Sequence, residues 1–199
     1  MMFNRQRLSK FFGFCVVVFA LAIATNALMI KIPLKQLVIE SEAIVLGKVQ
    51  SVRCEWSLDK RLILSIVRVR VQDTMRGDLM VPDIILEVPG GTMGDLSLKV
   101  TNMPTFHENE EIVIFLRSIK NLADTKHSFT VAQNYFPAYE VYGKAQGKYS
   151  IDAEGMAIKS GYETVNEDKD PENFLPIESL KTQIHLILRE DISRRQRKR

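Results

Sequence analysis

The sequence predicts a mainly β protein: a small closed or partly open barrel, or a sandwich, with a short N-terminal helix and a C-terminal amphipathic helix. Two observations support this fold class. Short apolar runs with the two-residue alternation of strands are separated by turn residues about every 10 positions. The stretch from Gly90 to Arg117 then combines a glycine turn, an alternating strand, a proline-broken loop and a continuous apolar strand.

An export signal is expected at residues 1–27. Three basic residues precede an uncharged apolar run from Phe11 to Ala24, and small residues up to Ala27 offer cleavage sites. The run is shorter than the roughly 20 residues that a membrane-spanning helix needs. The chain is therefore expected to be secreted or periplasmic, without stable membrane insertion after cleavage. The alternative is an uncleaved signal that anchors the chain in a membrane.

Residues 28–188 are expected to form one domain that begins with a short helix and three strands. Pro33 suits a first helical turn, and Leu34, Leu37 and Val38 share one face, so the helix should pack on a sheet. The strands are expected at 43–54, 62–73 and 84–88. Gly47 inside the first indicates a bulge or a tight bend. The second has the clearest alternation, with valines on one face and arginines on the other.

Two further strands are expected in the central stretch, at Leu96–Val100 and Ile112–Leu116. The first alternates, as a strand with one solvated face does. The second is apolar on both faces, which is typical of a covered central strand. Gly90-Gly91, directly after the apolar run 84–88, predicts a chain reversal before this pair. Pro104 is expected to end the first of the two strands.

The C-terminal half predicts more short strands and one long helix. Candidate strands lie at 129–132 and 139–142. Residues 143–151 indicate a turn that enters another strand, and residues 156–158 are expected to pair back as a hairpin. Residues 162–173 are acidic and linker-like. An amphipathic helix is expected from Pro176 to Ser193, docked on the domain through an apolar stripe. A basic tail, residues 189–199, is expected to trail into solvent from Arg194 onward.

Removal of the signal changes both the charge and the cysteine content. The chain has 27 Lys and Arg against 24 Asp and Glu, and the signal carries three of the basic residues, so the mature chain is balanced. The tail is basic, and residues 28–188 are net acidic. Of two cysteines only Cys54 remains. Cys54 is expected to be an inert buried thiol or to link two chains by a disulfide.

The chain resembles a widespread group of secreted bacterial domains that has no known activity. The likeness covers about residues 34–188 and brings no known cofactor. The shared motifs are, in order, residues 41–49, residues 71–77, Gly90-Gly91-Thr92-Met93-Gly94, Met103-Pro104-Thr105-Phe106, residues 109–116 and Gln146-Gly147-Lys148-Tyr149.

The strand order is also similar to that of netrin-like domains and tissue inhibitors of metalloproteinases. Those domains are five-stranded barrels of the oligonucleotide/oligosaccharide-binding (OB) type. The resemblance implies an OB-like barrel for residues 43–117. The inhibitors chelate the zinc of their target through an N-terminal cysteine, but no cysteine lies between Ala27 and Cys54 here. That mechanism is therefore not expected.

Catalytic, cofactor-binding and metal-binding residues are not expected. His107 with Glu108–Glu111 lacks the second His of a zinc protease helix, and a solvated acidic turn fits these residues better. The glycines of Gly90–Gly94 lack the Gly-Lys-Ser/Thr ending of a phosphate loop. Cys54 has no base partner at the sequence level.

Aromatic residues and the basic tail offer possible contacts with a ligand. The aromatics could stack on a ligand or fill the core. The tail could touch an anionic lipid or polymer, or serve as a solvated end. Nucleic acid is not expected for an exported body of net negative charge. The candidate aromatics are Trp56, Tyr135, Phe136, Tyr139, Tyr142 and Tyr149.

These observations lead to two functional hypotheses. The first is a secreted, non-enzymatic module of the cell envelope that binds an envelope protein or polymer. The second is a hydrolase, or a regulator of a protease, with a site assembled from distant loops around Glu108–Glu111 and His127. A dimer linked through Cys54 is a third possibility, independent of either.

Overall fold

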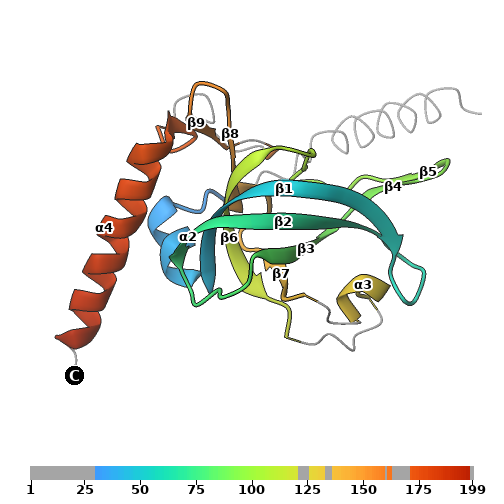
Figure 1. Cartoon of the computed structure of the whole chain (residues 1–199), viewed down its shortest axis with the longest axis horizontal. Helices are drawn as coiled ribbons and strands as arrows, with labels where there is room; N and C mark the ends of the chain where they lie inside the picture. The colour runs from blue at the N-terminus through green and yellow to red at the C-terminus, as the bar shows by residue number, and fades with distance from the viewer. Residues whose placement is uncertain (1–29, 121–125, 133–135, 160, 163–170, 198–199) are drawn as a thin grey trace, which may run out of the picture.

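A computed structural model describes residues 30–120, 126–132, 136–159, 161–162 and 171–197. The expected export signal, residues 1–27, lies outside the described residues. Within them the chain folds into a mainly β structure built around a closed five-stranded mixed barrel, with a short N-terminal helix and a long C-terminal helix (Figure 1). The fold class that the sequence predicts is confirmed.

Five strands form the barrel: β1 (Ala43–Trp56), β2 (Ile63–Arg76), β3 (Asp83–Pro89), β7 (Ala138–Val141) and β6 (Glu111–Ser118). They neighbour one another in that order, and β6 closes the barrel by pairing with β1. Only β3 and β7 run parallel; the other pairs are antiparallel. The register of β1 on β2 shifts at Leu46/Gly47, which confirms the irregularity that Gly47 predicts.

The fourth predicted strand does not belong to the barrel. Leu96–Leu98 is strand β5, which pairs with β4 (Gly91–Met93) in a separate two-stranded hairpin that projects from the barrel (Figure 1). Leu96 is exposed, so this segment lacks the buried apolar face that barrel membership requires. β7 takes the place instead, and the barrel reaches beyond the span 43–117 that the resemblance implies.

The chain reversal also lies later in the sequence than predicted. Gly90 and Gly91 have positive φ and lead the chain from β3 straight into β4, whereas the reversal falls at Gly94–Asp95. A Cβ atom on Gly91 would stand 2.5 Å from the Sγ atom of Cys54, so this position also needs glycine for close packing.

A second layer covers one side of the barrel. It consists of α2 (Leu34–Glu40), the short helix η1 (Lys144–Gly147), three further strands and α4 (Ile177–Gln196). The strands β8 (Lys148–Ile151), β9 (Met156–Ile158) and β10 (Phe174–Pro176) extend the sheet from β6. The predicted first helix and the β8–β9 hairpin are confirmed.

Two predictions in the C-terminal half need correction. Residues 129–132 form helix α3 (Phe129–Ala132), not a strand. Helix α4 continues to Gln196, so the residues from Arg194 to Gln196 belong to the helix rather than to a trailing end.

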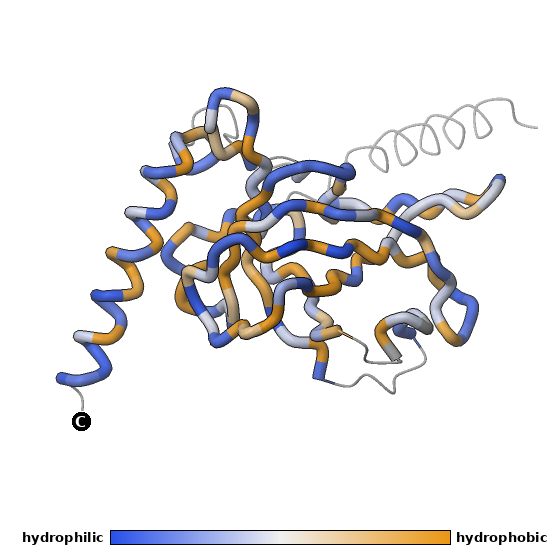
Figure 2. Tube along the Cα trace, in the orientation of Figure 1, coloured by the Kyte–Doolittle hydropathy of each residue, from blue (hydrophilic) through white to orange (hydrophobic). Residues whose placement is uncertain are grey.

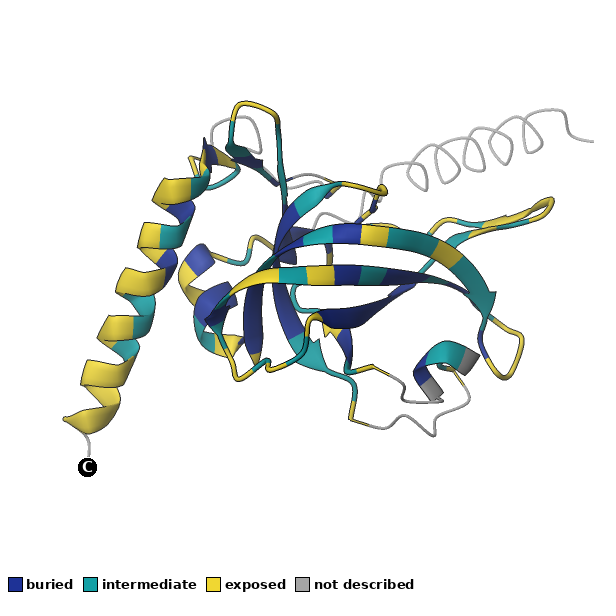
Figure 3. Ribbon diagram, in the orientation of Figure 1, coloured by how far each residue is buried: buried dark blue, intermediate teal, exposed yellow. Residues whose placement is uncertain are grey.

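Three apolar clusters hold these layers together. The barrel interior is filled by alternate residues of all five strands, including Val67, Val69 and Leu86. A second cluster joins the outside of β1 and β6 to α2 and α4 through residues such as Leu37 and Leu180. The third lies on the outer face of β2 and β3, beneath α3. Figure 2 shows the apolar stretches along the barrel strands, and Figure 3 shows that these are the buried ones while one side of α4 is exposed.

Candidate functional site

The outer face of β1, β2 and β3 carries the polar side chains that alternate with the barrel interior. On β2 the valines point inward and the intervening Arg68 and Arg70 point outward, as the sequence predicts. A groove of about 490 Å³ lies on this outer face, beside α3. It is lined by Ser51, Arg53 and Glu55 of β1, Ile66 and Arg68 of β2, Ile85 of β3, and Thr130 and Phe136.

One buried carboxylate orients two of the arginines. Asp83, at the start of β3, accepts hydrogen bonds from Nη2 of Arg68 and from Nε of Arg70. The Asp83 side chain is only 4% exposed, while the arginines are 43% and 51% exposed. The hydrogen bond from Arg70 holds the pKa of Asp83 below its ordinary value, and the hydrogen bond from Arg68 lowers that pKa further. Burial acts in the opposite direction, but the two arginines outweigh it. The carboxylate therefore stays ionised and fixes both guanidinium groups.

Arg68 is held from a second side by an aromatic ring. Its guanidinium carbon lies 5.0 Å from the ring centroid of Phe136, within the range of a cation–π contact. Its Nε atom is buried and has no hydrogen-bond partner among the described residues. A buried donor without an acceptor is unfavourable, but the side chain as a whole is 43% exposed, so other donors of this guanidinium are accessible from the groove.

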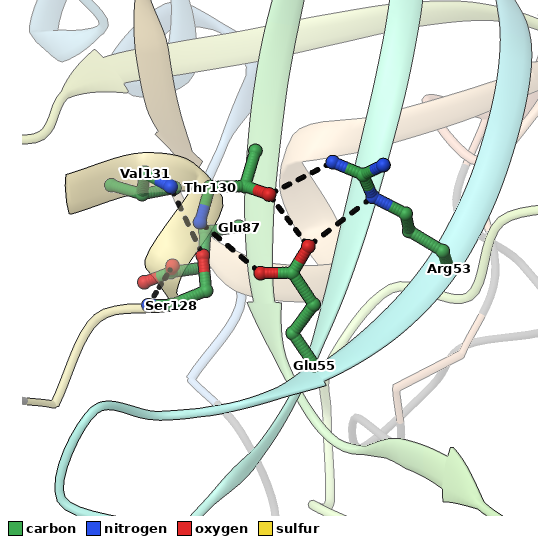
Figure 4. A network of polar contacts seen from close by, with 6 residues as sticks. All are labelled: Arg53, Glu55, Glu87, Ser128, Thr130 and Val131. Carbon is green, nitrogen blue, oxygen red and sulfur yellow. Dashed lines mark hydrogen bonds and ion pairs between the residues drawn. The ribbon is translucent and has the colours of Figure 1, made fainter. Parts of the chain in front are cut away.

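A network of polar contacts attaches α3 to the same face (Figure 4). Glu55 accepts hydrogen bonds from the backbone N–H and the hydroxyl of Thr130, and it pairs with Arg53. Arg53 in turn donates to the Thr130 hydroxyl at 2.8 Å. Glu87 accepts the backbone N–H of Ser128 at 2.9 Å. These contacts come from two different strands and converge on the first turn of α3.

The same network explains why residues 129–132 are helical. Ser128 is the N-cap residue, because its Oγ accepts the backbone N–H of Val131 three positions on. Together with Glu55 and Glu87 it satisfies N–H groups that a helix start leaves without partners. Phe, Thr and Val favour strands, but these tertiary hydrogen bonds override that preference.

His127 belongs to this network rather than to the acidic turn. Its Nδ1 atom lies 2.5 Å from Oε1 of Glu87, and both side chains are nearly buried. Glu110 of the acidic turn has other partners: it accepts hydrogen bonds from Lys148 and Ser150, each at 2.6 Å. His107 is 80% exposed beside it. The structure thus gives Glu110 and His127 separate partners and does not join them in one site.

The remaining candidates from the sequence take several places. Tyr139 and Tyr149 are buried in the core, and Tyr142 stacks against Arg117. Phe136 lines the groove. Trp56 is half-buried at the end of β1, and Tyr135 lies outside the described residues. Among these aromatics, therefore, the groove contains Phe136.

Cys54 is half-buried, with its Sγ atom 3.8 Å from the hydroxyl of Ser65. An intermolecular disulfide through it stays a prediction.

The groove was not predicted from the sequence as a unit. The alternation predicts that Arg68 and Arg70 lie on the face opposite the valines, but nothing in the sequence joins them to Asp83, Phe136 and Arg53. The signal that could have found the groove is the run of outward arginines on a strand otherwise rich in valine.

The described residues contain no group of three or more His, Cys, Asp or Glu side chains that could hold a metal ion. In the described part of the chain, no helix combines the length and apolarity that a membrane crossing requires.

Known proteins offer no guide to the function, which is therefore inferred from the fold and the groove. No family model matches the chain, and no curated protein matches it.

Proposed function

We propose that the chain is an exported, non-enzymatic binding module that holds part of a macromolecular partner in the groove on β1, β2 and β3. One observation carries the proposal: this groove combines apolar side chains with arginines that are already fixed in place. Barrels of the OB type bind their ligands on the face of the second and third strands, beside the loop between the last two barrel strands. The groove and α3 occupy that position here.

The polar side chains around the groove support a binding role because their partners serve the fold. Glu55 and Glu87 satisfy the N-terminus of α3, and Asp83 anchors two arginines. Groups used in this way keep the walls of the groove rigid. Rigid walls favour binding, since less conformational freedom is lost when a ligand arrives.

The location of the module is proposed from the sequence. The basic start and the apolar run within residues 1–27 have the layout of an export signal, so the partner is expected to be a protein or polymer of the cell envelope or beyond it.

The test compares capture of partners by the full chain and by two tryptophan variants. Ser51→Trp fills the groove from β1, while Gln72→Trp places the same side chain on the exposed outer face of β2, away from the groove lining. Each tagged chain is incubated with envelope extract, crosslinked and analysed by mass spectrometry. A partner captured by the wild type and by Gln72→Trp, but not by Ser51→Trp, is the expected result.

Two results would contradict the proposal. One is equal capture by Ser51→Trp, which would move the binding surface elsewhere. The other is turnover of a hydrolase substrate by the purified chain that His127→Gln abolishes. Since Gln cannot act as a general base, that loss would assign chemistry to the Glu87–His127 pair.

A further inference from the structure

We infer that the groove binds an acidic segment of a polypeptide, with a carboxylate on Arg68 and an apolar neighbour against Ile66, Ile85 and Phe136. This inference rests on the proposed function and specifies the chemistry of the ligand. Three features of the groove carry it: the fixed and partly exposed guanidinium of Arg68, the neighbouring guanidinium of Arg53, and the apolar walls between the charged groups.

The first feature is the fixed and partly exposed guanidinium of Arg68. Asp83 engages Nη2 of this guanidinium and Phe136 lies against its face, so the group is held in one orientation. Its buried Nε atom has no partner among the described residues. A carboxylate is the ligand group that matches the planar donors of a guanidinium, and it can engage two of them at once.

The second feature is the position of Arg53. It lies opposite Ile66 in the register of β1 and β2, and Arg68 lies opposite Ser51, so the two arginines are diagonal neighbours on one face. Arg53 is also fixed, by Glu55 at 3.3 Å and Thr130 at 2.8 Å. The charged residues that line the groove are Arg53, Arg68 and Glu55, so the lining itself has one positive charge more than negative, which attracts an anion.

The third feature favours a peptide over a nucleic acid. Proteins that bind single-stranded nucleic acid stack successive bases on several aromatic rings. Phe136 is the aromatic that lines this groove, and its ring is already in contact with Arg68. Ile66 and Ile85 instead offer aliphatic walls, which suit an apolar side chain adjacent to the carboxylate.

The experiment measures fluorescence anisotropy of labelled probes with the full chain. The probes are a peptide that repeats Glu-Leu-Gly, its Gln-Leu-Gly counterpart and an oligothymidylate of equal length. The variants are Arg68→Gln, Arg68→Lys and a control, Arg61→Gln, which removes the same charge from an exposed site outside the groove. Because Asp83 keeps Arg70 as a partner, Arg68→Gln should still fold, and circular dichroism checks this.

The Glu peptide should bind the wild type and Arg61→Gln equally, and far more tightly than the Gln peptide. Arg68→Gln should weaken binding about tenfold or more. Arg68→Lys should also weaken it, since lysine keeps the charge but lacks the planar donors.

Absence of binding to the Glu peptide, an unchanged affinity in Arg68→Gln, or tighter binding of oligothymidylate would each overturn the inference. If the Glu peptide fails while Ser51→Trp still abolishes capture of a partner, the proposed function stands and only the acidic ligand is wrong. If Ser51→Trp also has no effect, both proposals fall.

Discussion

Gly147 shows at a single residue why the motif Gln146–Tyr149 has a structural role. A Cβ atom at this position would stand 1.7 Å from the backbone oxygen of Tyr142, a distance that no side chain could accept. Its neighbours are also engaged: the amide of Gln146 contacts the backbone of Ile30 and Ile32, and Tyr149 packs in the core against Phe115. The motif therefore fastens the N-terminal stretch and η1 to the barrel.

The first prediction compares two glycine substitutions. Gly147→Ala should destabilise the protein severely, by about 4 kcal/mol or more, or prevent folding, because a backbone atom must move. Gly94→Ala is the control: its φ is +58°, but no atom lies within 4 Å of the added Cβ. It should cost only about 1 kcal/mol through the left-handed backbone. Urea unfolding measures both, and equal losses would contradict this reading of Gly147.

Lys148, the next residue, forms a nearly buried ion pair with Glu110. Its ammonium group donates to Oε1 of Glu110 and to the backbone oxygen of Thr105, each at 2.6 Å. Burial lowers the pKa of Lys148. Burial alone would raise the pKa of Glu110, but hydrogen bonds from Lys148 and Ser150 outweigh it and lower that pKa. Removing one partner therefore leaves a charge that water reaches poorly.

The second prediction is a double-mutant cycle on this pair. Lys148→Met should lower the free energy of unfolding by about 3 kcal/mol, because Glu110 loses its counter-charge. The double variant Glu110→Met with Lys148→Met should lose less than the two single variants together. Lys99→Met, at an exposed site, should change stability by no more than about 0.5 kcal/mol. Strict additivity in the cycle would show that the pair is not coupled.

Helix α3 is the element whose stability depends most directly on its neighbours. It spans four residues, too few to be stable alone, and its first turn is held by side chains of β1 and β3. Val131 of α3 packs in one apolar cluster with Leu64, Ile66 and Ile85, so the same contacts hold together the part of the outer barrel face that lies beside the groove.

The third prediction concerns this attachment. Glu87→Ala should raise the hydrogen-exchange rate of the Ser128 amide about tenfold or more, since that N–H loses its acceptor and His127 loses its partner. Glu55→Ala should act mainly on the Thr130 amide. Glu140→Ala, on the exposed side of β7, is the matched control and should leave both amides protected. Unchanged exchange at Ser128 in Glu87→Ala would show that other contacts hold α3.

Elements with a strong local pattern were predictable from the sequence, and those set by distant partners were not. The local pattern alone predicts the correct element in three places: the alternation on β2, the apolar run of β6 and the apolar stripe of α4. α3 looked like a strand because the carboxylates that cap it come from residues 55 and 87. β5 looked like a barrel strand because alternation predicts a strand but not its partner.

The closed barrel itself depends on pairing between residues far apart in the chain. β3 and β7 are neighbours in the sheet and pair at two positions, Ile85 with Ala138 and Leu86 with Tyr139. In the chain they are separated by β4, β5 and β6. No local pattern specifies that contact. For the same reason the sequence does not predict the groove, which joins β1, β2 and β3 to residues near 130 and 136, although the alternation on β2 predicts the face on which Arg68 lies.

At the scale of the whole molecule, ionised carboxylates that bridge distant segments make stability depend on pH. Asp83 joins β3 to two arginines of β2, and Glu110 joins the loop before β6 to β8. The pKa values of both carboxyls are lowered in the folded state, from the ordinary values of 3.8 and 4.5. The unfolded state therefore binds more protons in acid, and stability falls as the pH falls below these ordinary values.

The fourth prediction follows from that sign. The urea midpoint of the wild type should hold steady at weakly acidic pH and fall as the pH is lowered from about 5 to about 3. Asp83→Asn with Glu110→Gln should be less stable near neutral pH, because the charged hydrogen bonds are gone, by about 1.5–3 kcal/mol for each site. The double variant should lose less of its remaining stability in acid, so the two curves should converge.

Each single variant should remove its own part of the acid dependence. A double variant whose midpoint falls as steeply as that of the wild type would show that other carboxyls control acid unfolding. Asp83 and Glu110 would then contribute no more than the other carboxyl groups of the protein to the pH dependence of its unfolding.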